Sequence, residues 1–171
     1  DNGPIPPDDC ALLHAVNDVR ALHQLPPLQM DARLHSAAVA HARDMAIKGY
    51  FAHISPDGTT PAERATAAGY THWTSIAENI AAGYTSVVGA VDGWVGSPGH
   101  FKNIRCTSCV HTGVARVTVQ GSKWTDYYVQ VFASGNEDRT QWRQCDEDIP
   151  EDPEPTRLPT RLPTRLPTRL P

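Results

Sequence analysis

Apolar residues recur at helical spacing in the first two thirds of the chain and alternate with polar residues in the last third. The first helical stretch follows Asp8 or Asp9, either of which is suited to cap a helix N-terminus. One face of this predicted helix carries four apolar residues: Leu12, Val16, Val19 and Leu22. Because proline cannot continue a helix, we expect Pro26 and Pro27 to end the segment.

Three further helices are predicted on the same grounds. The second begins at Asp31, is rich in alanine and stops at Gly49. The third begins at a Thr60-Pro-Ala-Glu63 capping box and runs to about residue 68. The fourth opens at Thr85 or Ser86 and continues through Trp94, and the Pro98-Gly99 pair is expected to break it.

Alternating apolar and polar residues predict strands at 75–81, 113–120 and 127–133. The last two are separated by a short turn around Gly121, so they are expected to form an antiparallel hairpin. Since helices come first and the main strands come last, the pattern predicts an α+β fold rather than a doubly wound sheet.

Charge and hydropathy exclude two classes of function. The chain of 171 residues has a formal net charge of −4. The segment after Cys145 holds six acids and four arginines, which leaves 11 basic and 13 acidic side chains in the preceding 145 residues. No basic face is implied, so nucleic acid is not expected as a partner. No apolar run reaches the roughly 20 residues that a transmembrane helix needs.

Composition divides the chain into four parts. We expect a proline-rich lead at 1–9, one compact domain at 10–145, an acidic linker at 146–155 and a disordered tail at 156–171. The tail consists of four Thr-Arg-Leu-Pro repeats, which can form neither a helix nor a buried face. It is interpreted as a spacer, with a wall-binding or glycan-bearing tether as the alternative.

Four cysteines allow three disulfide pairings. The simplest joins Cys10 to Cys145 around the domain and Cys106 to Cys109 as a local loop. For the Cys106-x-x-Cys109 pair, a zinc site with His100 or His111 and a redox-active dithiol are alternatives. Disulfides indicate an oxidising compartment. The chain also starts without methionine, so we interpret it as the mature form of an extracellular protein from which a signal peptide has been removed.

Six phrases in a fixed order resemble the CAP superfamily, which includes cysteine-rich secretory proteins, antigen 5 and class-one pathogenesis-related proteins. They lie at residues 17–28, 50–58, 77–80, 93–104, 112–115 and 128–132, and include Ala-Glu-Asn-Ile and Ser-Pro-Gly-His. The similarity is greatest to the shorter, bacterial-type branch and covers roughly residues 10 to 135. It implies an α-β-α sandwich with a small central antiparallel sheet, and an open cleft floored by that sheet.

The resemblance also implies a site of two histidines and two acids. His53 and His100 correspond to the histidines, and Glu78 corresponds to the first acid. The position of the second acid is Ser97 here, so the tetrad is incomplete, and Asp92 is the candidate replacement. Two imidazoles and one carboxylate form a three-ligand set that suits Zn²⁺ or another divalent cation and leaves a position open for water.

The resemblance, the predicted cleft residues and the repeat tail leave three functions open. The first is a secreted, non-enzymatic binding module for sterols, fatty acids or other apolar ligands, or for surface partners, with a cation in the cleft. The second is a metal-dependent hydrolase or peptidase that uses His53, Glu78 and His100. The third is a structural wall or matrix protein attached through its tail.

Overall fold

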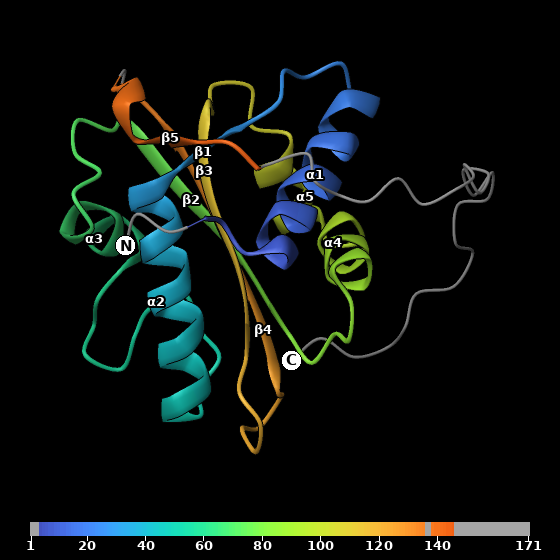
Figure 1. Cartoon of the computed structure of the whole chain (residues 1–171), viewed down its shortest axis with the longest axis vertical. Helices are drawn as coiled ribbons and strands as arrows, with labels where there is room; N and C mark the ends of the chain where they lie inside the picture. Colours follow the sequence, from blue (N-terminus) through green and yellow to red (C-terminus); the bar gives the residue numbers. More distant parts are fainter. Residues whose placement is uncertain (1–3, 136–137, 146–171) are drawn as a thin grey trace.

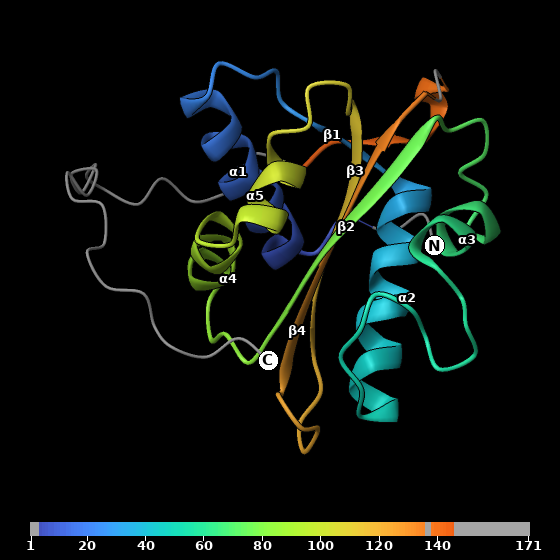
Figure 2. The same ribbon diagram turned by 180° about the vertical axis from the view of Figure 1, so that it is seen from behind.

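The computed structural model describes residues 4–135 and 138–145, which form three layers (Figure 1). A central sheet carries α1, α4 and α5 on one face and α2 and α3 on the other, as the reverse view in Figure 2 also shows. The first group of helices comprises α1 (Pro7–Leu22), α4 (Val87–Val95) and α5 (Pro98–Ile104). The second comprises α2 (Ala32–Lys48) and α3 (Pro61–Ala67). The predicted α-β-α sandwich is therefore confirmed.

The sheet has five strands in the order β2-β4-β3-β1-β5. Its strands are β1 (Gln29–Asp31), β2 (Ser75–Ala82), β3 (His111–Thr118), β4 (Asp126–Ser134) and β5 (Trp142–Arg143). The β2–β4 and β3–β4 pairs are antiparallel, and the predicted hairpin is β3–β4. The sheet is mixed rather than wholly antiparallel, because β1 pairs with β3 in parallel. The sequence pattern missed β1 and β5, which are too short to show an alternation.

Alternating residues of β4 belong to two separate cores. Tyr128 and Phe132 pack under α1, α4 and α5, whereas Val129 and Val131 pack under α2 and α3. Successive side chains of a strand point to opposite faces of the sheet. The buried strand β4 thus joins both apolar layers into one unit.

Two details of α1 differ from the prediction. The N-cap position is Pro6, whose side chain makes no capping bond, and the Asp9 carboxylate is buried. It accepts a hydrogen bond from the backbone N–H of Arg116 and lies 2.8 Å from Nε2 of His35. Asp9 therefore ties α1 to β3 instead of capping the helix. Leu22 was expected on the buried face, but it lies in the last turn and is 78% exposed.

The expected break at Pro98 is instead the start of another helix. Ser97 is the N-cap and Pro98 the first residue of α5. Proline is well tolerated there, because the first N–H groups of a helix have no partner within it. The other starts agree with the sequence: Asp31 caps α2, and the Thr60–Glu63 capping box is formed.

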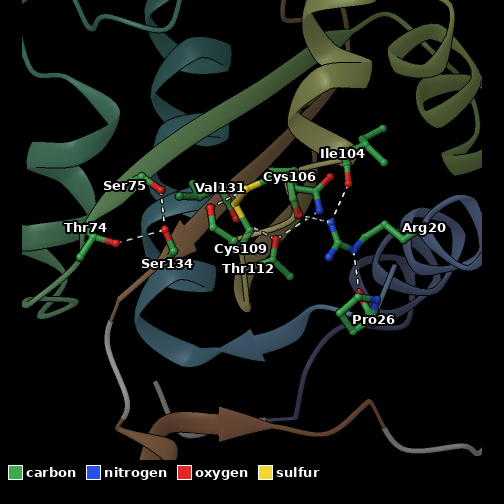
Figure 3. The surroundings of a disulfide bond; sticks show 12 residues. Arg20, Pro26, Thr74, Ser75, Ile104, Cys106, Cys109, Thr112, Val131 and Ser134 are labelled. Atoms are coloured by element: carbon green, nitrogen blue, oxygen red, sulfur yellow. Dashed lines mark hydrogen bonds between the residues drawn. A yellow bond between two sulfur atoms is a disulfide. The ribbon is translucent and has the colours of Figure 1, made fainter. Parts of the chain in front are cut away.

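Both favoured disulfides are present. Cys10–Cys145 joins α1 to the segment that follows β5. Cys106–Cys109 closes the loop between α5 and β3, which Figure 3 shows in detail. This pairing leaves no thiolate of the pair to hold zinc. The linker at 146–155 and the repeat tail at 156–171 lie outside the described residues, so the domain boundaries stay a prediction.

A stability test follows from the closeness of α2 and β3. A Cβ atom added to Gly113 would collide with backbone atoms of Leu34 and His35, which cannot move aside as a side chain can. We expect Gly113→Ala to lower the free energy of unfolding by about 3 kcal/mol. Denaturant unfolding measures this, with Gly99→Ala as control, because a Cβ at Gly99 meets nothing within 4 Å. Equal stability of the two variants would contradict the packing described.

Candidate functional site

The site is built around the carboxylate of Glu78, which is buried on the edge strand β2. Its side chain is only 1% exposed. His53 Nδ1 lies 2.9 Å from Oε1, and Arg64 Nη2 donates to Oε2 at 2.8 Å. Both carboxylate oxygens therefore have a partner within the protein, and the buried negative charge is compensated.

Arg64 also fixes the loop that carries His53. From α3, its guanidinium donates to the backbone oxygens of His53 and Thr59 and to Oγ of Ser55. A guanidinium presents its donors in a rigid planar fork, so these bonds hold the loop in one position relative to Glu78. The bonds of Arg64 thus explain how His53, a loop residue, is held next to Glu78 on the edge strand β2.

A third histidine, His41, lies beside this carboxylate. It is on α2, 1% exposed, with Nε2 3.0 Å from the carbonyl oxygen of Ala52 and 3.8 Å from Oε1 of Glu78. Burial lowers the pKa of His41 below that of a free imidazole, although the Glu78 charge acts in the opposite direction. From the sequence, His41 was not singled out as a site residue. Its spacing of three from Ala38 and four from Met45 was the available signal that it faces inward.

Tyr50, in the family phrase at residues 50–58 that also contains His53, has its own acidic partner. Its hydroxyl donates to Asp44 at 2.6 Å. Burial, together with this hydrogen bond, raises the pKa of Tyr50 to about 12. Tyr50 is therefore a neutral hydrogen-bond donor to Asp44 beside the loop that carries His53.

His100 approaches the sheet edge from the opposite layer, on α5. Its backbone oxygen accepts from Asn79, the neighbour of Glu78 on β2, and Asn79 is in turn bonded to Asn103 of α5. Burial lowers the pKa of His100, and the neighbouring His53 lowers it further. The two imidazoles are therefore close enough to interact electrostatically, although they come from opposite faces of the sandwich.

Two ring nitrogens of this site face no protein partner. Nδ1 of His100 is buried and has no hydrogen bond. Nδ1 of His53 is committed to Glu78, while its side chain is 47% exposed and Nε2 has no partner among the described residues. A neutral imidazole with one nitrogen donating carries a lone pair on the other. Each histidine can therefore accept a hydrogen bond or bind a metal ion.

Among the described residues, neither position considered for the second acid of the tetrad forms a hydrogen bond or ion pair with these rings. Asp92 is exposed on α4, and Ser97 caps α5 through its backbone position without a side-chain bond. In the described part of the chain, no group of three or more His, Cys, Asp or Glu side chains is arranged to hold a metal ion. Both oxygens of Glu78 already have partners within the protein. The metal-ligand set of His53, Glu78 and His100 therefore stays a prediction.

A family model described as the cysteine-rich secretory protein family, or CAP, matches residues 13–132. The chain belongs to the CAP family. Its CAP domain is 36% identical over 118 residues to the uncharacterized protein YkwD of Bacillus subtilis, covering 69% of this chain and 45% of that protein. It is 32% identical over 103 residues to the uncharacterized membrane protein YlbC of the same organism, covering 60% of this chain and 30% of that protein. The chain thus spans less than half the length of these curated relatives.

Solved structures show the same fold. An extracellular protein of Bacillus anthracis with an SCP domain is similar with a TM-score of 0.65 and 30% identity, covering 78% of this chain and 45% of that chain. An outer surface protein of Borrelia burgdorferi has a TM-score of 0.67 at 22% identity, and the match covers 74% of this chain and 91% of that chain. Among the described helices of this chain, none is long and apolar enough to cross a membrane.

The ion pair at the centre of the CAP site can be tested by substitution. Removing one member of a buried pair leaves the other charge uncompensated, so we expect Arg64→Met to lower the free energy of unfolding by about 3 kcal/mol. Arg43→Met, at an exposed position of α2, is the matched control. A double-mutant cycle with Glu78→Gln isolates the pair. A coupling energy near zero would contradict the central place given to this contact.

The lowered pKa values of His41 and His100 predict how stability depends on pH. An unperturbed imidazole has a pKa of 6.5, so the unfolded chain binds protons at these positions before the folded chain does. The neutral His41 and His100 side chains therefore favour the folded state fully above pH 6.5, and this stabilisation is lost as the pH falls below 6.5. Denaturation with a chelator present, at about pH 7.5 and about pH 5, measures this. We expect the free energy of unfolding to decrease less between these two pH values in His41→Gln and in His100→Gln than in the unsubstituted protein. The same decrease in both variants as in the unsubstituted protein would contradict the prediction.

Proposed function

We propose that this CAP domain is an extracellular, non-enzymatic binding module whose binding site is formed by His53 and His100. The observation that carries the proposal is the pair of ring nitrogens without a protein partner, one on each side of the sheet edge. A buried polar atom without a partner costs free energy, and a ligand that pairs with it recovers that loss.

A divalent transition-metal ion, Zn²⁺ in particular, suits this pair of donors. Neutral imidazole nitrogens are among its preferred ligands, and Glu78 would orient His53 as an outer-shell carboxylate. When bound, the ion would supply a positive charge and open coordination positions for a partner's oxygen or nitrogen atoms. His53 and His100 would hold it, while Glu78 remains bonded to Arg64.

Apolar ligands and surface partners belong to the same proposal. Ile54 follows His53 and is 55% exposed, so an apolar group stands next to the exposed imidazole. A sterol or fatty acid could therefore contact both. Attachment to a wall or matrix is an alternative that depends on the tail at 156–171, outside the described residues.

The hydrolase alternative is less well supported by the geometry. If His53 and His100 hold the metal ion, Glu78 is the residue of the three that is left to act as a general base beside a bound water. Each of its oxygens already accepts a hydrogen bond at 2.8 or 2.9 Å, so accepting a proton would require breaking one of them.

Thermal unfolding with zinc tests the proposal. After treatment with a chelator, we expect ZnCl₂ to raise the melting temperature, because a ligand at 100 times its Kd stabilises the folded state by about 2.7 kcal/mol. His53→Ala and His100→Ala should each abolish the shift. His72→Asn is the control: His72 is exposed, and asparagine tolerates its positive φ of 61°.

The zinc proposal is contradicted by an absent shift at millimolar zinc, or by a shift that survives both histidine substitutions. Extraction of labelled sterol or fatty acid by the same variants tests the apolar ligand separately. Extraction reduced by His53→Ala but not by His72→Asn would place that ligand at the same site.

A further inference from the structure

A second polar feature lies away from the histidine site, where the ends of α1 and α5 meet. A cavity of about 300 Å³ opens there to solvent. It is lined by His23, Leu25, Lys102, Arg105 and Thr107. The lining contains two cationic side chains, one imidazole and one hydroxyl, but no carboxylate.

The aromatic ring of Phe101 holds two of the lining side chains in place. The guanidinium carbon of Arg105 lies 4.5 Å from the ring centroid, and the His23 ring meets it edge-on at 5.2 Å. A guanidinium stacked on an aromatic ring loses freedom before any ligand arrives. The donors at the cavity are therefore partly preorganised.

Arg20, a fully buried cation, is bonded to the backbone next to the lining residues. Figure 3 shows its guanidinium between Pro26 and the α5–β3 loop, where it donates to the backbone oxygens of Pro26, Ile104 and Cys106. The cavity-lining residues are direct chain neighbours of these acceptors: Leu25 precedes Pro26, and Arg105 and Thr107 flank Cys106. The remaining terminal nitrogen, Nη2, is buried without a partner. Burial lowers the pKa of Arg20, yet an arginine keeps its charge in proteins.

Three cations at or near this cavity have no counter-ion in the described part of the chain. Within residues 4–135 and 138–145, Arg20, Lys102 and Arg105 form no ion pair, whereas Arg33, Arg64 and Arg116 each contact a carboxylate. The negative ends of the α1 and α5 dipoles account for part of this positive charge. They do not account for Nη2, because the bonds of Arg20 to backbone oxygens use Nε and Nη1.

We propose that this cavity is a binding site for a phosphate or sulfate group. Lys102 and Arg105 would contact the anion, the Thr107 hydroxyl would donate a hydrogen bond to it, and the buried charge of Arg20 would add electrostatic attraction. Charge-assisted hydrogen bonds from arginine and lysine to such oxyanions are stronger than neutral ones. The ligand is the free oxyanion or a monoester that presents it, including a lipid headgroup.

An NMR titration tests the site on the whole chain with a chelator present, so that its outcome is independent of His53 and His100. Inorganic phosphate, sulfate and glycerol 3-phosphate are each compared with chloride at matched ionic strength. We expect saturable shifts of the amides around Arg105, and about tenfold weaker binding in Lys102→Ala/Arg105→Ala. Arg43→Ala/Lys123→Ala makes the same charge change at exposed positions elsewhere and should bind normally.

Vesicles of phosphatidylcholine with and without phosphatidic acid distinguish the sources of the group. Sedimentation with phosphatidic acid that requires Lys102 and Arg105, without binding of glycerol 3-phosphate, would assign the group to a lipid headgroup. Saturable binding of the soluble ester would assign it to a free ligand. The proposal is overturned if the anions give no more shift than chloride and no vesicle is bound, or if both double variants lose binding equally.

Discussion

The buried carboxylate of Glu78 constrains the arrangement of the whole candidate site. A charge with 1% exposure would destabilise the fold strongly without compensation, so its partners must be held in place. Arg64 comes from α3, His53 from the preceding loop and Glu78 from the sheet edge. One compensated charge thus brings three separate segments to a common point, and the tautomer of His53 follows from it.

The position of β2 at the edge of the sheet explains why the site has contributions from both helical layers. Consecutive residues of a strand face opposite sides, so Glu78 meets the layer of α3 while Asn79 meets α5. An interior strand would be covered by neighbours on both edges and could not let two layers approach each other. His53 and His100 reach this edge from opposite layers, and that arrangement is a consequence of topology.

Unpartnered polar atoms mark both places that we propose to bind ligands. At the sheet edge the atom is an imidazole nitrogen, a neutral acceptor that suits a cation or a donor. Between α1 and α5 it is a guanidinium N–H with two further cations nearby, which suits an anion. Elsewhere the fold pairs its buried charges closely, as with Asp9, which is bonded to β3 and next to His35.

The sequence by itself determined the helices that begin with strong caps, the long strands and the favoured disulfides, because these depend on local periodicity, turn residues and cysteine count. It did not determine β1 and β5, the start of α5 at Pro98 or the inward turn of Asp9, since each depends on a partner distant in the chain. His53 and Glu78 were named only through the resemblance to a family. Their bond to each other, the part of Arg64 and the burial of His41 were decided by the tertiary structure, because no spacing along the chain encodes which groups compensate a charge buried at a sheet edge.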